Sequence, residues 1–107
     1  MNQLILSFGG NIGDVPGIFE KALVMLIEAL HGDLLKKSSL YKTEPLYDRA
    51  QPWFWNMAAI LETPVTATDA LNICLETENH LGRTRDKRRY GPRQIDIDLI
   101  FFNDLLM

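Results

Sequence analysis

The chain has 107 residues, of which 47% are hydrophobic and 23% are charged, and its net charge is −3 at pH 7. This length and composition predict one compact globular domain, residues 1–107, and exclude a disordered polymer. The apolar runs are too short to cross a bilayer, and the N-terminus has neither a basic leader nor a small-residue cleavage site, so we expect a cytoplasmic protein that engages no membrane.

The N-terminal third predicts a strand followed by a helix. Residues 4–8 alternate in hydrophobicity, and the glycines of GGNIG are expected to end the strand. Asp14 is placed to cap the helix, with Pro16 in its first turn, and Gly32 is expected to end it. The apolar stripe of this helix consists of Ile18, Ala22, Met25, Leu26 and Ala29.

The GGNIG loop between this strand and helix allows two interpretations. A glycine-rich turn at a helix N-terminus can seat a phosphate. However, a GxGxxG fingerprint would need glycine in place of Phe8, and no GK[ST] sequence follows, so the loop matches neither a dinucleotide-binding turn nor a Walker loop. We therefore favour a structural turn.

The middle of the chain predicts two strands and a second helix. Residues 34–41 form a moderately clear strand pattern, and residues 54–62 form a third strand, with a loop between them. The helix is expected to begin at Thr66 or Thr68, and Thr66 with Asp69 fits a capping box. Its expected apolar stripe consists of Leu71, Cys74, Leu75 and Leu81, with Glu78 as a charged member of the same face.

Cys74, the single cysteine, is expected to be a small core residue and cannot form an internal disulfide. Residues 95–102 complete the chain as a fourth strand. The order βαββαβ predicts an α+β fold of the ferredoxin-like plan, an antiparallel four-stranded sheet with both helices on one face. The opposite face is left for a ligand, but the plan hosts many functions and does not name one.

The fourth strand carries a pair of carboxylates. Ile95, Ile97, Leu99 and Phe101 are expected on one face, and Asp96, Asp98, Ile100 and Phe102 on the other. At about 3.3 Å per residue, the two aspartates stand roughly 6.6 Å apart along the strand, which suits one or two hard cations. Two ordinary aspartates on an exposed edge strand are the alternative.

A basic segment immediately precedes this strand. Six of the eleven basic residues fall in residues 83–93, namely Arg83, Arg85, Lys87, Arg88, Arg89 and Arg93. Positive charge confined to one loop of an acidic protein suits a small polyanion better than a long duplex. A solvated run of charge is the alternative. Arginines beside a cation-binding pair are typical of sites that hold nucleotide phosphates.

Residues 41–56 contain more aromatic side chains than a linker needs. Strand alternation places Phe54 with Asn56 on one face and Trp53 with Trp55 on the other. An aromatic ring beside an amide suits a flat heterocycle, which the ring can stack on while the amide reads its edge. Core packing is the alternative for some of these rings, and the two pairs are expected to differ in role.

Taken together, these segments resemble the 6-hydroxymethyl-7,8-dihydropterin pyrophosphokinases of folate biosynthesis. The resemblance runs along essentially the whole chain through SFGGNIGD, SSLYKTEPL, QPWFWNMAAILET and RRYGPRQIDIDLI. It implies a ferredoxin-like core that transfers the β,γ-pyrophosphoryl unit of MgATP to the pterin hydroxymethyl group and releases AMP. ATP as co-substrate, the pterin and two Mg²⁺ ions would be the ligands, and we expect a monomer that binds no nucleic acid.

The resemblance also implies roles for individual residues. Asp96 and Asp98 would hold the metal ions, and Asp96 would also contact the pterin. Arg83 and Arg93 would grip the phosphates and act in catalysis with the two aspartates. The further ATP-binding positions are Arg85, Arg89, Tyr90 and Leu99. The further pterin-binding positions are Thr43, Glu44, Leu46, Phe54 and Asn56. Glu78 matches an acidic position near the site, and a capping or surface role is its alternative.

Some positions depart from the family pattern. Asp86 stands where a lysine is often found, Tyr90 replaces a frequent tryptophan, and Leu75 replaces a frequent glutamine. The chain also stops at Met107, whereas the family continues through a segment that supplies further site residues. An inactive truncated homologue is therefore one alternative. A non-catalytic nucleotide- or RNA-binding ferredoxin-like module is another, although the RNA-binding signature [KR]G[FY][GA]FV is absent from the sequence.

Overall fold

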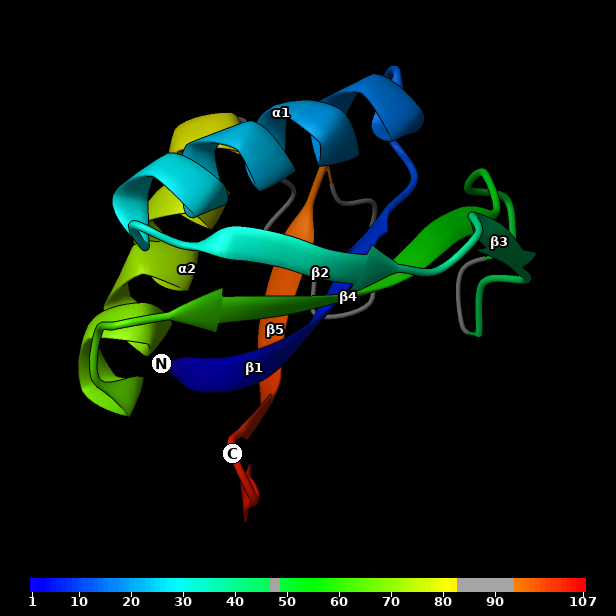
Figure 1. Ribbon diagram of the computed structural model, residues 1–107. Coiled ribbons are helices and arrows are strands. Elements are labelled where there is room, and N and C mark those ends of the chain that lie inside the picture. The colour runs from blue at the N-terminus through cyan, green and yellow to red at the C-terminus, as the bar shows by residue number, and fades with distance from the viewer. Residues whose placement is uncertain (47–48, 83–93) are drawn as a thin grey trace.

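The computed structural model describes residues 1–46, 49–82 and 94–107, which form one sheet and two helices (Figure 1). The elements are β1 (Asn2–Gly10), α1 (Val15–Ala29), β2 (Asp33–Lys37), β3 (Tyr41–Thr43), β4 (Phe54–Thr63), α2 (Ala67–Leu81), β5 (Asp96–Phe102) and β6 (Leu105–Leu106). The strand order is β2-β4-β1-β5-β6, with β3 also paired to β4, and every pairing is antiparallel. The α+β prediction is confirmed.

The described part of the chain contains six strands, whereas the sequence predicted four. The expected strand at 34–41 is split into β2 and β3, which pair with different parts of β4. At the break, the Ser38 N–H still donates to the Ala58 carbonyl at 2.8 Å, but the Ala58 N–H donates to the Ser38 hydroxyl at 2.9 Å and not to a backbone carbonyl. After β5, Asn103 adopts a left-handed conformation with φ of 54° and turns the chain back into β6.

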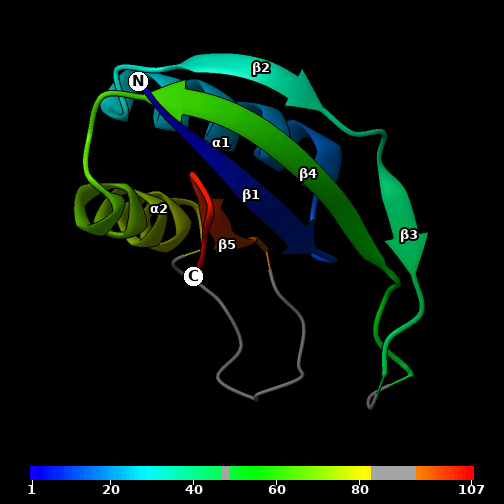
Figure 2. The same ribbon diagram turned by 60° about the horizontal axis from the view of Figure 1, so that its bottom comes forward.

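Both helices pack on the same face of the sheet (Figure 2). Alternate residues of β1, Leu4, Leu6 and Phe8, are fully buried against them, and the Phe8 and Phe19 rings meet edge to face with centroids 5.7 Å apart. The opposite face carries no helix among the described residues. Within these residues, neither helix is long and apolar enough to span a membrane.

Helix α1 begins as predicted, but the face that it buries is rotated slightly from the predicted one. The Asp14 carboxylate accepts a hydrogen bond from the Gly17 N–H at 3.3 Å, which confirms it as the N-cap residue. The buried side chains are Val15, Phe19, Ala22, Leu23 and Leu26, so of the expected stripe only Ala22 and Leu26 are fully buried. The helix ends at Ala29, before the expected Gly32.

The GGNIG segment differs from the predicted turn. Strand β1 continues through Gly9 and Gly10, which pair with β4, and the left-handed turn residue is Gly13 with φ of 78°. The Asp14 carboxylate already occupies the start of α1, where a bound phosphate would have to sit. A protein anion at this helix N-terminus supports the structural interpretation over phosphate binding.

Helix α2 presents a different face to the core from the one predicted. Thr66 caps it, accepting a hydrogen bond from the Asp69 N–H at 3.2 Å, as expected. The buried residues are Ala70, Cys74 and Thr77, whereas Leu71 and Leu75 are 40% and 48% exposed. Thr77 tolerates burial because its hydroxyl donates to the Ile73 carbonyl at 2.8 Å. The predicted stripe is therefore correct for Cys74 and wrong for the two leucines.

A β-bulge near the end of β5 reverses the faces that were predicted for its last residues. Ile97 and Leu99 are buried as expected, but Leu6 pairs with Leu99 while Ile5 pairs with Phe101, which leaves Ile100 as an extra residue. The extra residue shifts the alternation by one position. Phe102 is consequently buried in the core at 6% exposure, and Phe101 takes the other face, the reverse of the prediction.

Candidate functional site

The helix-free face of the sheet brings residues from four strands into one row. Asp96 of β5 pairs with Gly9 of β1, Gly9 pairs with Asn56 of β4, and Asn56 pairs with Tyr41 of β3. Because neighbouring strands lie about 4.8 Å apart, the backbones of Asp96 and Asn56 are about 10 Å apart. The tertiary structure thus places a predicted metal ligand and the predicted heterocycle-reading amide on one row.

Gly9 leaves the middle of this row without a side chain. A Cβ atom at Gly9 would lie 3.7 Å from Asn56 Oδ1 and 3.9 Å from the Trp55 carbonyl oxygen. The strand backbone is therefore exposed as a flat floor between the Asp96 and Asn56 side chains. Such a floor, bounded by a carboxylate and an amide, suits a planar polar ring.

A hydrogen bond fixes the orientation of the Asn56 amide. Its Nδ2 donates to the Thr43 hydroxyl at 2.9 Å, which turns Oδ1 toward Gly9. Thr43 itself pairs with Phe54 across β3 and β4. Three predicted pterin-binding residues, Thr43, Phe54 and Asn56, are thus brought together, with an acceptor oxygen facing the floor of the row.

Phe54 and Trp55 lie on opposite faces of β4, as alternation predicts, whereas Trp53 precedes the strand, is 53% exposed and does not share the core packing of Trp55. Trp55 packs against the core, and the Lys42 Nζ lies 4.7 Å from its ring centroid. Phe54 lies half-buried beside Thr43, on the helix-free face that also carries Asn56. Packing against the core therefore accounts for Trp55, whereas Phe54 is available to the site.

Glu44 and Leu46 lie in the exposed segment that follows β3. The Glu44 carboxylate forms an ion pair of 3.1 Å with Arg49, and both side chains are exposed. Leu46 is 79% exposed. The structure does not bring either side chain onto the Asp96–Asn56 row, and their pterin contacts stay a prediction.

A buried polar pair supports the segment that leads into β4, and sequence reasoning missed it. Asn11 Nδ2 donates to Gln51 Oε1 at 2.9 Å and to the Pro52 carbonyl at 2.8 Å, and both amide side chains are buried. The pair ties the β1–α1 connection to the loop just before Phe54. The only sequence signal was a polar residue in each of the GGN and QPW segments, 40 positions apart.

Asp96 and Asp98 share the helix-free face, as predicted. Asp96 is half-buried opposite Gly9, and Asp98 is exposed opposite Ser7, so small neighbours leave space beside both carboxylates. No group of three or more His, Cys, Asp or Glu side chains that could hold a metal occurs in the residues described. Two carboxylates with room for water and phosphate oxygens are the donor set that suits Mg²⁺ with a bound nucleotide.

Behind the aspartates, α2 places Glu78 and Cys74 against β5. Glu78 Oε2 accepts a hydrogen bond from the Ile97 N–H at 2.8 Å, so Glu78 does not merely cap the helix or lie on the surface. Burial, and then the negative charges of Glu78 and Asp98, raise the pKa of the Cys74 thiol to about 12. Cys74 is consequently a protonated core residue, as expected, and no nucleophile.

Leu99 and the basic loop complete the predicted ATP-binding set. Leu99 is 7% exposed and faces the helices, so an ATP contact from this residue would have to come from its backbone. The remaining predicted residues lie outside the described part of the chain: Arg83, Arg85, Arg89, Tyr90 and Arg93. They connect the end of α2 to the start of β5, and Arg93 is three residues before Asp96.

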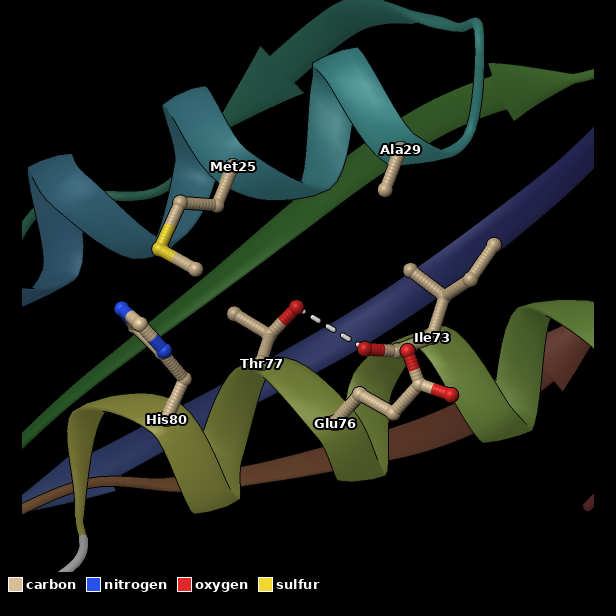
Figure 3. Close-up of a pocket in the computed structure, with 6 residues that line it drawn as sticks. All are labelled: Met25, Ala29, Ile73, Glu76, Thr77 and His80. Carbon is tan, nitrogen blue, oxygen red and sulfur yellow. Dashed lines mark hydrogen bonds between the residues drawn. The ribbon is translucent and has the colours of Figure 1, made fainter.

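Two hollows lie near these elements. One, of about 250 Å³, lies between α1 and α2 (Figure 3) and is lined by Met25, Ala29, Ile73, Glu76, Thr77 and His80. The hydroxyl of Thr77 is already bonded to the Ile73 carbonyl. The hollow lies between the helices, whereas Asp96 is on the helix-free face of the sheet. A second hollow, of about 280 Å³, is on the helix-free face and includes Ile5, Ala58 and Ile60. Only the second shares a face with the row.

Comparison with known proteins agrees with the resemblance. A family model described as 7,8-dihydro-6-hydroxymethylpterin-pyrophosphokinase (HPPK) matches residues 5–107. The 2-amino-4-hydroxy-6-hydroxymethyldihydropteridine pyrophosphokinase of Methylorubrum extorquens is 37% identical over 102 residues, which are 95% of this chain and 64% of that protein. The Bacillus subtilis protein of the same name is 35% identical over 102 residues, covering 95% of this chain and 60% of that protein. The chain thus spans less than two thirds of the length of these relatives.

Solved structures support the same fold. A crystal structure of Plasmodium falciparum HPPK-DHPS with SDX-DHP superposes with a TM-score of 0.67 at 17% sequence identity, covering 97% of this chain and 29% of that chain. A crystal structure of an HPPK-DHPS in complex with substrates superposes with the same TM-score at 18% identity, covering 95% and 28% of the two chains. At such identities the likeness concerns the fold alone.

Proposed function

This chain belongs to the 7,8-dihydro-6-hydroxymethylpterin-pyrophosphokinase family, and on that basis we propose that it forms the core of an ATP-dependent pyrophosphokinase of folate biosynthesis. The proposed reaction moves pyrophosphate from MgATP to 6-hydroxymethyl-7,8-dihydropterin and releases AMP. The observation that carries the proposal is the row in which Asp96 and Asn56 flank Gly9. Family membership and the names of the relatives support an enzyme over a non-catalytic binding module.

The pterin ring would lie on the Gly9 floor. Asn56 Oδ1, oriented by Thr43, would accept a hydrogen bond from an N–H group on the ring edge, and Phe54 would supply an apolar contact. Asp96 at the other end of the row would lie beside the hydroxymethyl group. A ring that spans from the amide to the carboxylate would thus have its reactive arm directed at the proposed cation site.

Asp96 and Asp98 would hold two magnesium ions together with the ATP phosphates. Bound there, the ions would lower the pKa of the attacking hydroxyl and offset charge on the phosphates. Arg83 and Arg93 would bind the transferring phosphoryl groups, and Arg85, Arg89, Tyr90 and the Leu99 backbone would contribute further ATP contacts. The aspartates' position on a strand that pairs with β1 supports this role, because a strand holds its side chains more rigidly than a loop does.

The bonds exchanged in this reaction follow from the product. The hydroxymethyl oxygen forms a bond to the β-phosphorus of ATP and loses its proton. The bond from the β-phosphorus to the oxygen that bridges it to the α-phosphate breaks, and AMP leaves with that electron pair. Rate enhancement would come mainly from alignment of the two substrates and stabilisation of charge.

The arrangement of the strands supports a ferredoxin-like core within this family. The order β2-β4-β1-β5, with helices after β1 and β4, is the order that such a core would have, and β3 and β6 would be additions to it. We also propose that residues 1–107 act as one domain and that the chain is a monomer.

Phosphorus NMR of a reaction with ATP, Mg²⁺ and the hydroxymethyl-dihydropterin tests the function. We expect AMP and the pterin pyrophosphate as products, and Asp96→Asn should abolish their formation. Calorimetric titration with a non-hydrolysable MgATP analogue tests binding without turnover. Formation of ADP, or full turnover by Asp96→Asn, would contradict the proposal.

A further inference from the structure

A carboxylate from α2 is bonded to the strand that carries the two aspartates. Glu78 Oε2 accepts a hydrogen bond from the Ile97 N–H at 2.8 Å. Ile97 stands between Asp96 and Asp98, and its side chain is buried at 4% exposure. Glu78 is thereby attached to a peptide group that lies midway between the proposed cation ligands.

The edge of β5 explains why this N–H group needs a side-chain acceptor. β5 pairs with β1 along one edge, whereas on its other edge β6 reaches only Phe101 and Phe102 among the described residues. In an antiparallel pair, successive N–H groups point to opposite edges, and the Ile97 N–H points away from β1 toward α2. A buried N–H group without an acceptor destabilises the fold, so Glu78 replaces a missing strand partner at this point.

The bond also places a negative charge behind the aspartates. Ile97, whose N–H holds this carboxylate at 2.8 Å, is the residue between Asp96 and Asp98, so the charge of Glu78 lies close to the backbone of both. A third carboxylate near the pair would strengthen the attraction for a divalent cation without having to coordinate it. A neutral amide in its place would keep the acceptor oxygen and lose this attraction.

We propose that Glu78 is a positioning residue for the cation site formed by Asp96 and Asp98. Through the Ile97 peptide it fixes the part of β5 from which both carboxylates project, and its charge adds to the negative potential of the site. The inference rests on the proposed role of the two aspartates as cation ligands. It assigns Glu78 no contact with ATP, pterin or metal.

Two measurements test the two parts of this role separately: Mn²⁺ affinity tests the effect on the cation site, and amide hydrogen exchange tests the bond to the Ile97 peptide. Mn²⁺ affinity is measured by the EPR signal of the free ion, and the exchange rate of the Ile97 N–H is measured by NMR. Glu78→Ala should accelerate Ile97 exchange at least tenfold and weaken Mn²⁺ binding by about tenfold, at the lower end of the effects seen for groups that orient metal ligands. Glu76→Gln, a charge loss at an exposed site on the same helix, should change neither.

Glu78→Gln is the variant that keeps volume and acceptor. It should retain slow Ile97 exchange, rescue most of the fold stability lost in Glu78→Ala, and bind Mn²⁺ less tightly than the wild type but more tightly than Glu78→Ala. If Glu78→Ala does not fold, the Mn²⁺ affinity of Glu78→Gln is compared with that of Glu76→Gln to measure the effect of the Glu78 charge. Wild-type Mn²⁺ affinity in Glu78→Gln would then overturn the inference.

Asp96→Asn and Asp98→Asn distinguish failure of this inference from failure of the proposed function. Both should weaken Mn²⁺ binding strongly while leaving Ile97 exchange unchanged. Unaltered Mn²⁺ binding in both variants would contradict the proposed cation site, and with it the proposed role of Glu78. Loss of binding in the aspartate variants, with wild-type behaviour of Glu78→Ala in both measurements, would overturn only the positioning role.

Discussion

Asp96 and Asn56 lie in the same cross-strand row on the helix-free face, separated only by the bare backbone of Gly9. The two residues are 40 positions apart in the chain, and β1 brings them together because it pairs with β4 on one edge and β5 on the other. The row therefore depends on the register of both pairings. Its width and the missing side chain at its centre are the features that a planar ligand would use.

Filling the centre of the row should block the pterin and spare the fold. A branched side chain in Gly9→Val would project between Asp96 and Asn56, where the Cβ alone already lies 3.7 Å from Asn56 Oδ1. We expect pterin affinity to fall at least tenfold, equivalent to about 1.4 kcal/mol, in a calorimetric titration. Ala58→Val adds the same branched side chain at an exposed site on the same face and should bind pterin normally. Equal affinity of the two variants would rule out the Gly9 floor as the ring site.

Removing the hydroxyl that orients Asn56 should weaken pterin binding more modestly. Thr43→Val preserves shape but takes away the acceptor for Asn56 Nδ2, so the amide is free to rotate. Loss of one hydrogen bond of this kind predicts a decrease of about 1 kcal/mol in binding free energy, roughly fivefold in affinity. Thr43→Ser keeps the oxygen and should bind like the wild type. A Thr43→Val protein with unchanged affinity in the same titration would show that the bond does not orient the amide for a ligand.

Asn11 and Gln51 should contribute to stability as a coupled pair. Asn11→Ala removes the buried bonds to Gln51 and to the Pro52 carbonyl, and we expect it to lower the free energy of unfolding by about 1 to 3 kcal/mol in urea titrations. Asn72→Ala, at an exposed position of α2, is the matched control and should change stability little. Because the two amides share one bond, the Asn11→Ala/Gln51→Ala double variant should lose less than the sum of the single losses. Strict additivity would mean that the pair is not coupled.

The Cys74 thiol should make stability fall at alkaline pH. Its pKa is raised on folding from an ordinary value of 9.0 to about 12, so between these values the folded state holds a proton that the unfolded state has lost. The stabilisation is fully present below pH 9 and decreases above it, by up to about 1.4 kcal/mol per pH unit. Urea titrations from pH 8 to 10.5 should show this decrease in the wild type and a smaller one in Cys74→Ala. Parallel pH profiles of the two proteins would contradict the raised pKa.

The outcome for individual elements shows how far the sequence could predict the fold. The caps at Asp14 and Thr66 and the facing of Ile97 against Asp96 and Asp98 were predicted correctly, because each depends on residues within a turn of helix or a few positions of strand. The face of α2 was predicted in part, since an apolar stripe through Leu71 and Leu75 is as regular in sequence as the one through Ala70 and Thr77 that is buried. The packing of α2 against β5 and α1 determines which of these two stripes is buried.

By itself, the sequence determined the two helix caps, the βαββαβ order of the long elements, the clustering of the arginines and the position of Asp96 and Asp98 on one side of a strand. Only the tertiary structure decided which residues meet across the sheet: Asp96 with Gly9 and Asn56, Glu78 with the Ile97 peptide, and Asn11 with Gln51. The physical reason is that short-range preferences act over a few residues, whereas strand register and the burial of polar groups are settled by packing between segments far apart in the chain.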